Sequence, residues 1–158
     1  MDSSAVEATY RQYFPMVREK CRRMLSNSQD AQDVAQETLV RLWEANLLGL
    51  PVPQLTAWLY RTSTRLAVDA LRRRARFDTG SPPEAASTEQ PDRILEQRQF
   101  LAQLARRIPR RELEVALLHR VDGLGQEELA EVLDVTDRTV RRLLKKLDVR
   151  LERLRKEA

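Results

Sequence analysis

Apolar residues near the C-terminus recur at spacings of three and four, and this spacing restricts that part of the chain to an α-helix. The stripe follows Thr136 and consists of Val140, Leu143, Leu144, Leu147, Leu151 and Leu154. Because an α-helix turns once in about 3.6 residues, such a stripe lies along one side of it. The other side carries the cations Arg138, Arg141, Arg142, Lys145 and Lys146. The sequence therefore predicts a helix with one buried face and one basic face.

A second, shorter helix is predicted just before it by the apolar residues Leu129, Ala130, Val132 and Leu133. Asp134 falls in the turn, and Asp tolerates the left-handed conformation better than most residues. Thr136 is a good N-cap for the second helix. A tight turn between two helices, with cations at the start of the second, is typical of a helix-turn-helix that enters the major groove of DNA. A solvated cationic helix is the alternative interpretation.

The rest of the chain also predicts helices. A third of the residues are charged, only four are Gly, and strand-like alternation of apolar and polar residues is nowhere sustained. Proline and glycine positions and the apolar spacing predict further helices over 4–26 with a break or restart at Pro15, from near Asp30 past Trp43, over 55–76, over 92–107 and from Pro109 to about Val121. The Asp30 side chain is expected to cap the second of these helices.

An acidic stretch divides the chain into two basic halves. Residues 77–92 contain four acids, no Arg or Lys, three prolines and almost nothing apolar to bury. Such a composition is typical of a flexible linker. The predicted fold class is all-α, with a helical domain at 1–76, the linker at 77–92 and a second helical domain, containing the helix-turn-helix, at 93–158.

The composition argues against catalysis. Cys21 is the only Cys and His119 the only His, and the sequence shows no nucleophile and base pair, metal-ligand cluster or phosphate loop. Cys21 is interpreted as a structural thiol and His119 as a partly buried helical residue. No apolar run is long enough to span a membrane, and no signal peptide is recognisable. These features predict a cytoplasmic protein that is not an enzyme, needs no metal or cofactor, and does not insert into a membrane.

Short motifs occur in a fixed order along the chain. They are DAQDVAQETLVRLW at 30–43, WLYR at 58–61, DALRR at 69–73, IP at 108–109, DGL at 122–124, EELAE at 127–131 and TV at 139–140. Each is weak alone, but together they resemble the extracytoplasmic-function (ECF) group of the sigma-70 family, in which the first of them has the pattern DAEDLVQExFLRLW. The resemblance covers nearly the whole chain. It implies a sigma factor, which binds core RNA polymerase and directs it to promoters.

The resemblance implies that the helix near Asp30 binds polymerase, because in the family this helix contacts the coiled-coil hairpin of the largest catalytic subunit. The spacing of its acids places them within about a quadrant of one helix face, where they can pair with cations of a partner. Capping and dipole compensation are the alternative explanation for Asp30 and Asp33, but they account less easily for Gln36 and Glu37, which lie beyond the first turn. The predicted polymerase-binding residues are Asp30, Asp33, Gln36, Glu37 and Arg41.

The family's first domain captures an unstacked base of the minus-10 promoter element, with the loop before the third helix and the exposed face of that helix. Here the loop 46–54 is rich in Leu and Pro, and Arg65 stands where the family usually has Asn. A solvated helix face explains the arginines of this helix as well as phosphate contact does. The predicted minus-10 residues are Trp58, Arg61, Arg65, Arg72 and Arg73.

The fourth region of the family reads the minus-35 element with the second helix of the helix-turn-helix. Gly125 replaces the Ser that commonly caps the first helix, and Gly also caps acceptably. A bidentate contact from Arg to guanine is the most specific one available to this basic face. The predicted minus-35 residues are Thr136, Arg138, Thr139, Arg141, Arg142 and Lys145.

The partners that the resemblance implies are core RNA polymerase, promoter DNA and, because the family is commonly held inactive by one, an anti-sigma factor. Two other function classes stay open. A sigma-like regulator that binds polymerase or DNA without initiating by itself is favoured by the unusual loop and Arg65. A stand-alone helix-turn-helix regulator would leave the first half of the chain unexplained.

Overall fold

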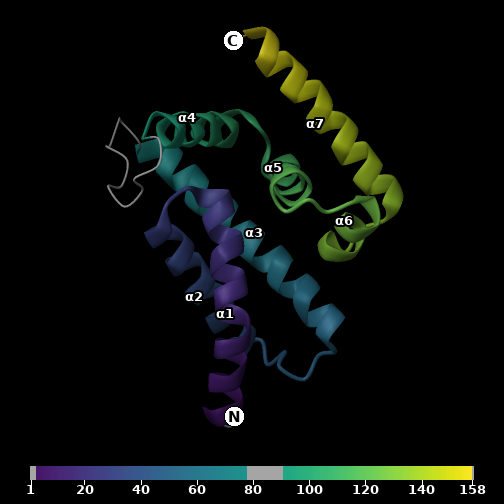
Figure 1. Ribbon diagram of the computed structural model, residues 1–158. Coiled ribbons are helices and arrows are strands. Elements are labelled where there is room, and N and C mark those ends of the chain that lie inside the picture. Colours follow the sequence, from purple (N-terminus) through teal and green to yellow (C-terminus); the bar gives the residue numbers. More distant parts are fainter. Residues whose placement is uncertain (1–2, 78–90, 158) are drawn as a thin grey trace.

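The structure is a computed structural model that describes residues 3–77 and 91–157, and every regular element in those ranges is helical (Figure 1). The elements are α1 (Ser3–Leu25), α2 (Ser28–Glu44), α3 (Val52–Phe77), α4 (Pro91–Arg107), α5 (Arg110–Ala116), the π-helical turn η1 (Leu117–Val121), α6 (Gln126–Leu133) and α7 (Asp137–Glu157). The predicted all-α fold is confirmed. Of the predicted linker 77–92, residues 78–90 lie outside the described part, and its two ends belong to α3 and α4.

The first three helices form one group because each buries an apolar stripe against the others. Val17 and Met24 of α1, Leu39 and Leu42 of α2, and Leu59 of α3 are almost completely buried. Each such side chain contributes about 1.5–3 kcal/mol when it leaves water. This packing orients α2 so that its charged side faces outward.

The predicted break at Pro15 is wrong, because α1 continues through it to Leu25. Pro15 is exposed, whereas Tyr13 and Val17 on either side of it are buried. A proline inside a helix removes one backbone hydrogen bond and costs about 3 kcal/mol. Burial of the stripe on both sides of Pro15 offsets this cost and keeps the two halves in one helix.

The predicted cap of α2 is also wrong. Asn27 is the N-cap, and its side-chain oxygen accepts a hydrogen bond from the Asp30 N–H at 2.9 Å. The helix therefore begins before Asp30, which lies in its first turn and pairs with Arg74 of α3 at 2.6 Å. Asn is as good a cap as Asp, and it leaves this carboxylate free for another role.

The second group consists of α4 to α7, and it contains the predicted helix-turn-helix in α6 and α7. Asp134 ends α6 in the left-handed conformation, with φ 57° and ψ 50°. Thr136 caps α7, since its hydroxyl oxygen accepts a hydrogen bond from the Thr139 N–H at 3.2 Å. Gly125 precedes α6 as its cap residue. These predictions of turn and cap are confirmed.

A π-helical turn redirects the chain between α5 and α6. In η1 the Asp122 N–H bonds to the Leu117 carbonyl at 3.1 Å, and Gly123 follows with φ 74°. His119 lies in this turn, half-buried, with its Nδ1 2.8 Å from the Leu124 carbonyl oxygen. The turn places the Asp122 side chain against α1 of the first group.

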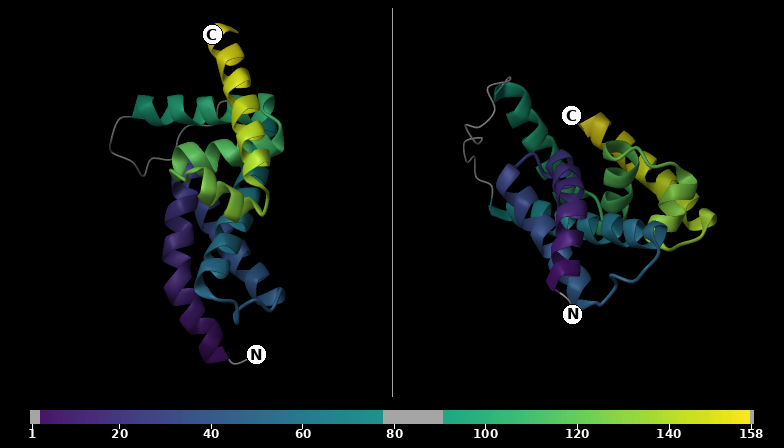
Figure 2. Two further views of the ribbon diagram at one scale, coloured as in Figure 1. Left: turned by 90° about the vertical axis from the view of Figure 1, so that its right-hand side faces the viewer. Right: turned by 60° about the horizontal axis from the view of Figure 1, so that its bottom comes forward.

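The two groups pack against each other along α3 (Figures 1 and 2). One side of α3 lies against α1 and α2, while α4, α5 and α6 contact it from elsewhere on its surface. The long helix α7 is the outermost element, and the two ends of the chain point away from each other in Figure 1. Two domains joined by a linker were predicted from the sequence, but this packing was not.

The thiol of Cys21 is expected to be almost inert towards alkylation. The side chain is completely buried, and burial raises its pKa to about 11. At pH 8 an exposed Cys is roughly one quarter thiolate, so Cys21 should react with iodoacetamide at least about a hundredfold more slowly. Mass spectrometry of timed samples measures the rate, with the chain in guanidinium chloride as the control. Reaction at the same speed in both conditions would contradict a buried thiol.

Candidate functional site

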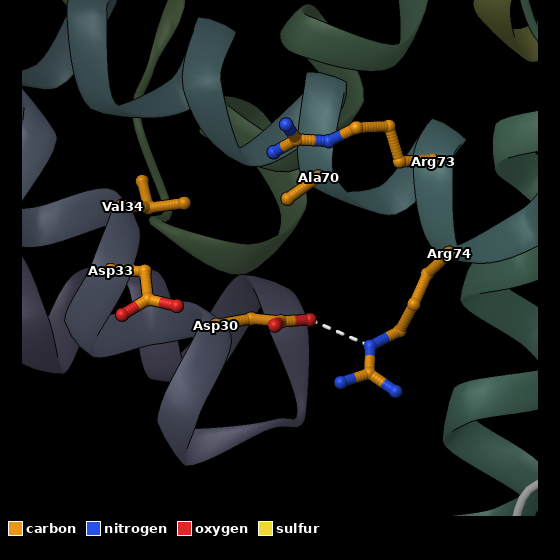
Figure 3. Close-up of a pocket in the computed structure, with 6 residues that line it drawn as sticks. All are labelled: Asp30, Asp33, Val34, Ala70, Arg73 and Arg74. Atoms are coloured by element: carbon orange, nitrogen blue, oxygen red, sulfur yellow. Dashed lines mark hydrogen bonds and ion pairs between the residues drawn. The ribbon is translucent and has the colours of Figure 1, made fainter.

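The outward side of α2 borders a groove against α3 (Figure 3). Acids of α2 and arginines of α3 face each other across an apolar floor that contains Val34 and Ala70. The residues that line the groove are Asp30, Asp33, Val34, Ala70, Arg73 and Arg74, and it continues along Glu37, Arg41, Leu66 and Asp69. Four of the five predicted polymerase-binding residues lie here. Gln36 is exposed on α2 but does not line the groove.

Two acids of this groove, Asp33 and Glu37, have only weak local partners. Gln29 donates to Asp33 at 3.0 Å, and Arg41 donates to Glu37 at 3.1 Å, each pair being exposed and one helical turn apart. Such exposed contacts contribute less than about 1 kcal/mol. A cationic partner can therefore replace them at little cost.

The basic face of α7 is open to solvent. Arg138, Arg141, Arg142 and Lys145 are all exposed, whereas the opposite face is buried at Val140, Leu143 and Leu147. The ion pairs that α7 makes in the described part of the chain use other residues, namely Asp148, Arg150, Glu152, Arg155 and Glu157. Thr136 is exposed and Thr139 half-buried, each in the capping contact. All six predicted minus-35 residues thus lie at or near one surface.

The predicted minus-10 residues of α3 are placed differently, since three of the four arginines contact the second group. Arg61 donates to the Val132 carbonyl at 3.1 Å, and Arg72 donates to the Ile108 carbonyl at 3.3 Å. Arg65 lies 4.0 Å from the Glu114 carboxylate. The remaining two residues point elsewhere: Arg73 is exposed at the groove, and Trp58 is half-buried against the core.

Around Arg65 the two groups share a network of charges. Arg110 of α5 bonds to the carboxylate of Asp69 and also donates to the Arg65 carbonyl at 3.2 Å, and both partners belong to α3. Glu114 lies 3.6 Å from Arg110. Burial raises the pKa of Glu114, although the neighbouring guanidinium groups of Arg65 and Arg110 oppose the shift.

A buried ion pair joins the groups at a second place. Lys20 of α1 lies 3.1 Å from the Asp122 carboxylate, and their side chains are 2% and 1% exposed. The same ammonium donates to the Thr64 hydroxyl at 2.7 Å and lies over the Tyr60 ring. Burial lowers the pKa of Lys20, and the charge of Asp122 opposes that shift. Arg23, half exposed, lies 3.4 Å from the same carboxylate.

Lys20 was not predicted from the sequence as a functional residue. The available signal was its position, since Lys20 interrupts the buried stripe of Val17, Cys21 and Met24. A Lys on an apolar face is almost never buried without a partner. Asp122 belongs to the motif at 122–124, but nothing in the local sequence connects it with Lys20.

The described residues contain no cluster of side chains that could hold a metal ion. None of the helices they form is both long and apolar enough to cross a membrane.

Two known sequence families match this chain, one in each group of helices. Sigma-70 region 2 matches residues 9–77, which fall in α1 to α3. Sigma-70 region 4 matches residues 99–146, which extend from within α4 into α7. Both regions occur in the order and at the places where the motifs lie. The chain belongs to the sigma-70 family, in its ECF group.

Individual ECF sigma factors are similar over most of the chain. The ECF RNA polymerase sigma factor SigW of Bacillus subtilis is 27% identical over 146 residues, which cover 82% of this chain and 77% of SigW. SigE of Mycolicibacterium smegmatis is 29% identical over 139 residues, 83% of this chain but only 54% of SigE. SigL of Mycobacterium tuberculosis is 29% identical over 98 residues, 59% of this chain and 55% of SigL.

The family assignment confirms the function class predicted from the motifs, a sigma factor that directs RNA polymerase to promoters. The chain contains both sigma-70 regions, region 2 in its first helical group and region 4 in its second.

Proposed function

We propose that this sigma factor docks core RNA polymerase through the groove face of α2, contacts the minus-10 strand through α3, and reads the minus-35 element through α7. The observation that supports this division most directly is charge. The region 2 match presents an exposed acidic helix face at a groove, and the region 4 match presents an exposed basic one. Surfaces of opposite sign on separate regions suit two different partners, a cationic protein and a polyanion.

Docking through α2 relies on Asp33 and Glu37, with Asp30, Gln36 and Arg41 at the borders of the same face. Their local partners are weak, so a cationic helix of the polymerase can take those places at little cost. Complementary charge would set both the orientation and the rate of association.

Promoter reading through α7 relies on cations that are exposed and have no ion-pair partner in the described part of the chain. The capped N-terminus of α7 at Thr136 adds backbone N–H groups, which suit a phosphate. Arg is the side chain best suited to bidentate contact with guanine in the major groove. The helix-turn-helix geometry thus supports a base-reading role at the first turns of α7.

The proposed contacts also require a minimum separation between the two helical groups on promoter DNA. Elements near positions minus 35 and minus 10 lie roughly 25 base pairs apart, or roughly 85 Å of duplex at 3.4 Å per pair. A compact chain of this length has a radius of gyration of roughly 15 Å. Both groups therefore cannot contact their elements while packed together, and the groups have to separate on promoter DNA.

In vitro transcription tests the proposed function. The chain is added to core polymerase with pooled genomic fragments as template, and the 5′ ends of the transcripts are sequenced. Start sites that depend on the chain and share elements near minus 10 and minus 35 are the expected result. Binding to polymerase without any chain-dependent start would instead favour a sigma-like regulator that does not initiate by itself. Sequence-specific duplex binding without polymerase binding would favour a stand-alone regulator.

Replacing Arg141 or Arg142 by Ala is expected to weaken binding to the minus-35 duplex. A side chain that reads a guanine should cost about 1–3 kcal/mol and relax the preference at that base pair alone. A phosphate contact should instead weaken all duplexes alike and reduce the salt dependence by about one ion. Fluorescence anisotropy over a salt series, on single-base variants of the duplex, separates the two. Arg153→Ala, at an exposed position further along α7, is the control. If neither Arg variant changes binding, α7 does not read DNA.

The same function places the protein in the cytoplasm with the polymerase and calls for no catalytic group. Its regulator is expected to be an anti-sigma factor that covers one of these faces. Purification of the chain from its native cells, with identification of the proteins bound to it, tests whether it is associated with polymerase and with an anti-sigma factor.

A further inference from the structure

The arginines proposed to contact the minus-10 strand also hold the two helical groups together. Arg61 and Arg72, both half-buried, use their guanidinium groups to bond to backbone carbonyls of the second group. In the opposite direction, Arg106 of α4 donates two hydrogen bonds to the Ala75 carbonyl of α3, at 2.9 and 3.2 Å. One face of α3 therefore serves two purposes that exclude each other.

We propose that the free protein is closed, with its second group covering the minus-10 face of α3, and that the buried Lys20–Asp122 pair is the lock that holds it closed. Only the assignment of the covered face of α3 to minus-10 DNA rests on the proposed function. The closed state itself rests on contacts between α1, α3 and the second group. The covered face becomes available when the groups separate.

The chemistry of the interface suits reversible closure. Lys20 and Asp122 come from different groups, and each regains water when the groups separate. The attraction within a buried ion pair is largely offset by the cost of removing both charges from water, so the pair specifies an arrangement more than it stabilises it. Removal of one charge from the closed state is different, because it leaves the other charge buried and unpaired.

Arg72 shows that the closed state does not satisfy this face completely. Its Nε is buried and has no hydrogen-bond partner among the described residues, although a terminal nitrogen of the same guanidinium bonds to Ile108. A phosphate or base edge can accept several hydrogen bonds from one guanidinium. Nucleic acid therefore competes well for Arg72 once the groups have separated.

The closed arrangement leaves the other proposed surfaces accessible. The α2 groove with Asp33 and Glu37 is open, and the basic face of α7 is exposed. Polymerase can dock on the closed protein, whereas the minus-10 strand cannot reach α3. This predicts an order of events in which polymerase docking precedes contact with the minus-10 strand.

The distance between the groups tests the lock. Spin labels are placed at Glu44→Cys on α2 and Arg153→Cys on α7, both exposed positions, in a Cys21→Ala background. Asp122→Asn keeps the shape of the side chain and removes its charge. The matched control is Asp148→Asn, at an exposed carboxylate that pairs with Arg120 inside the second group. Circular dichroism checks that every variant keeps the same helix content.

Pulsed electron–electron double resonance should give one narrow distance distribution for the parent chain and for Asp148→Asn. Asp122→Asn should shift most of the population to a broad distribution of distances, because the two groups are then joined only through the 13 residues between Phe77 and Pro91. Addition of core polymerase should lengthen the distance in the parent chain. A broad distribution in the parent chain itself, or an unchanged narrow one in Asp122→Asn, would overturn the proposal.

Single-stranded DNA tests which face is covered. A fluorescein-labelled pool of random oligonucleotides should bind Asp122→Asn several-fold more tightly than the unsubstituted chain, and Arg61→Gln in the same variant should remove the gain. Opening without any gain in affinity would overturn the claim that closure covers a DNA-binding face. If the unsubstituted chain and the open variant both fail to bind the pool, the minus-10 role of α3 in the proposed function fails, while the distances still decide whether the lock exists.

Discussion

Reversing Asp33 and Glu37 to Lys together should lower the affinity for core RNA polymerase by roughly 4 kcal/mol, which is about a thousandfold. Both carboxylates are exposed at the α2 groove, and two lysines there would face the cations of the partner. Folding should not change, because the exposed pairs lost with Gln29 and Arg41 contribute less than about 1 kcal/mol each. Fluorescence anisotropy against core polymerase and thermal unfolding are measured on the same samples.

The matched control reverses Glu7 and Glu19 on α1, two exposed acids that also have a local arginine partner. This variant carries the same change in net charge, so it should lose little affinity if the effect depends on position. Equal losses in both variants would mean that polymerase responds to overall charge and not to the α2 face. A loss of helix content in the α2 variant would show that its carboxylates are structural.

Leu147→Ala should destabilise the second group by about 2–5 kcal/mol, because Leu147 is 1% exposed on the buried side of α7. A helical group of this size has a stability of only about 5 kcal/mol, so the loss is large. Hydrogen exchange of the amides in α5 and α7 measures it for this group alone. Base preference in the folded fraction should stay the same, since the substituted face does not contact DNA.

Two neighbours provide graded controls for this substitution. Val149 is 47% exposed, so Val149→Ala should change stability by less than about 0.5 kcal/mol. Leu144 is half-buried, and Leu144→Ala should lie between the two. Equal effects at all three positions would contradict the stripe that the structure places against α5.

Much of this fold could be predicted from local sequence. Spacings of three and four predicted α7 and its basic face, and the polar residue Thr136 predicted its start. The left-handed conformation at Asp134 also follows from local chemistry, because a short polar side chain is among the few that tolerate it. Helix faces, caps and turns depend on residues a few positions apart, which a sequence displays directly.

The errors arose where two local explanations compete. Pro15 usually interrupts a helix, but the buried residues on both sides of it keep α1 continuous. Asp30 and Asn27 are both good caps, but Asn27 caps the helix while Asp30 pairs with Arg74 across the groove. In each case a contact from another helix decided the outcome.

The candidate binding surfaces also include some features that the sequence predicted and others that it did not. The acidic face of α2 and the basic face of α7 were predictable, since exposure on one side of an amphipathic helix follows from burial of the other. The partners of Arg61 and Arg72 were not, because a solvated arginine, a phosphate contact and an interdomain contact have the same local sequence.

The sequence by itself determined the helices, the helix-turn-helix and the family, because all of these are written in spacings within one element or in ordered motifs. Only the tertiary structure decided that the two groups pack along α3, and that Lys20 meets Asp122 about a hundred residues away. The physical reason is that a buried charge is stable only beside its counter-charge. That partner is identified by the path of the chain in space, which no local pattern of residues records.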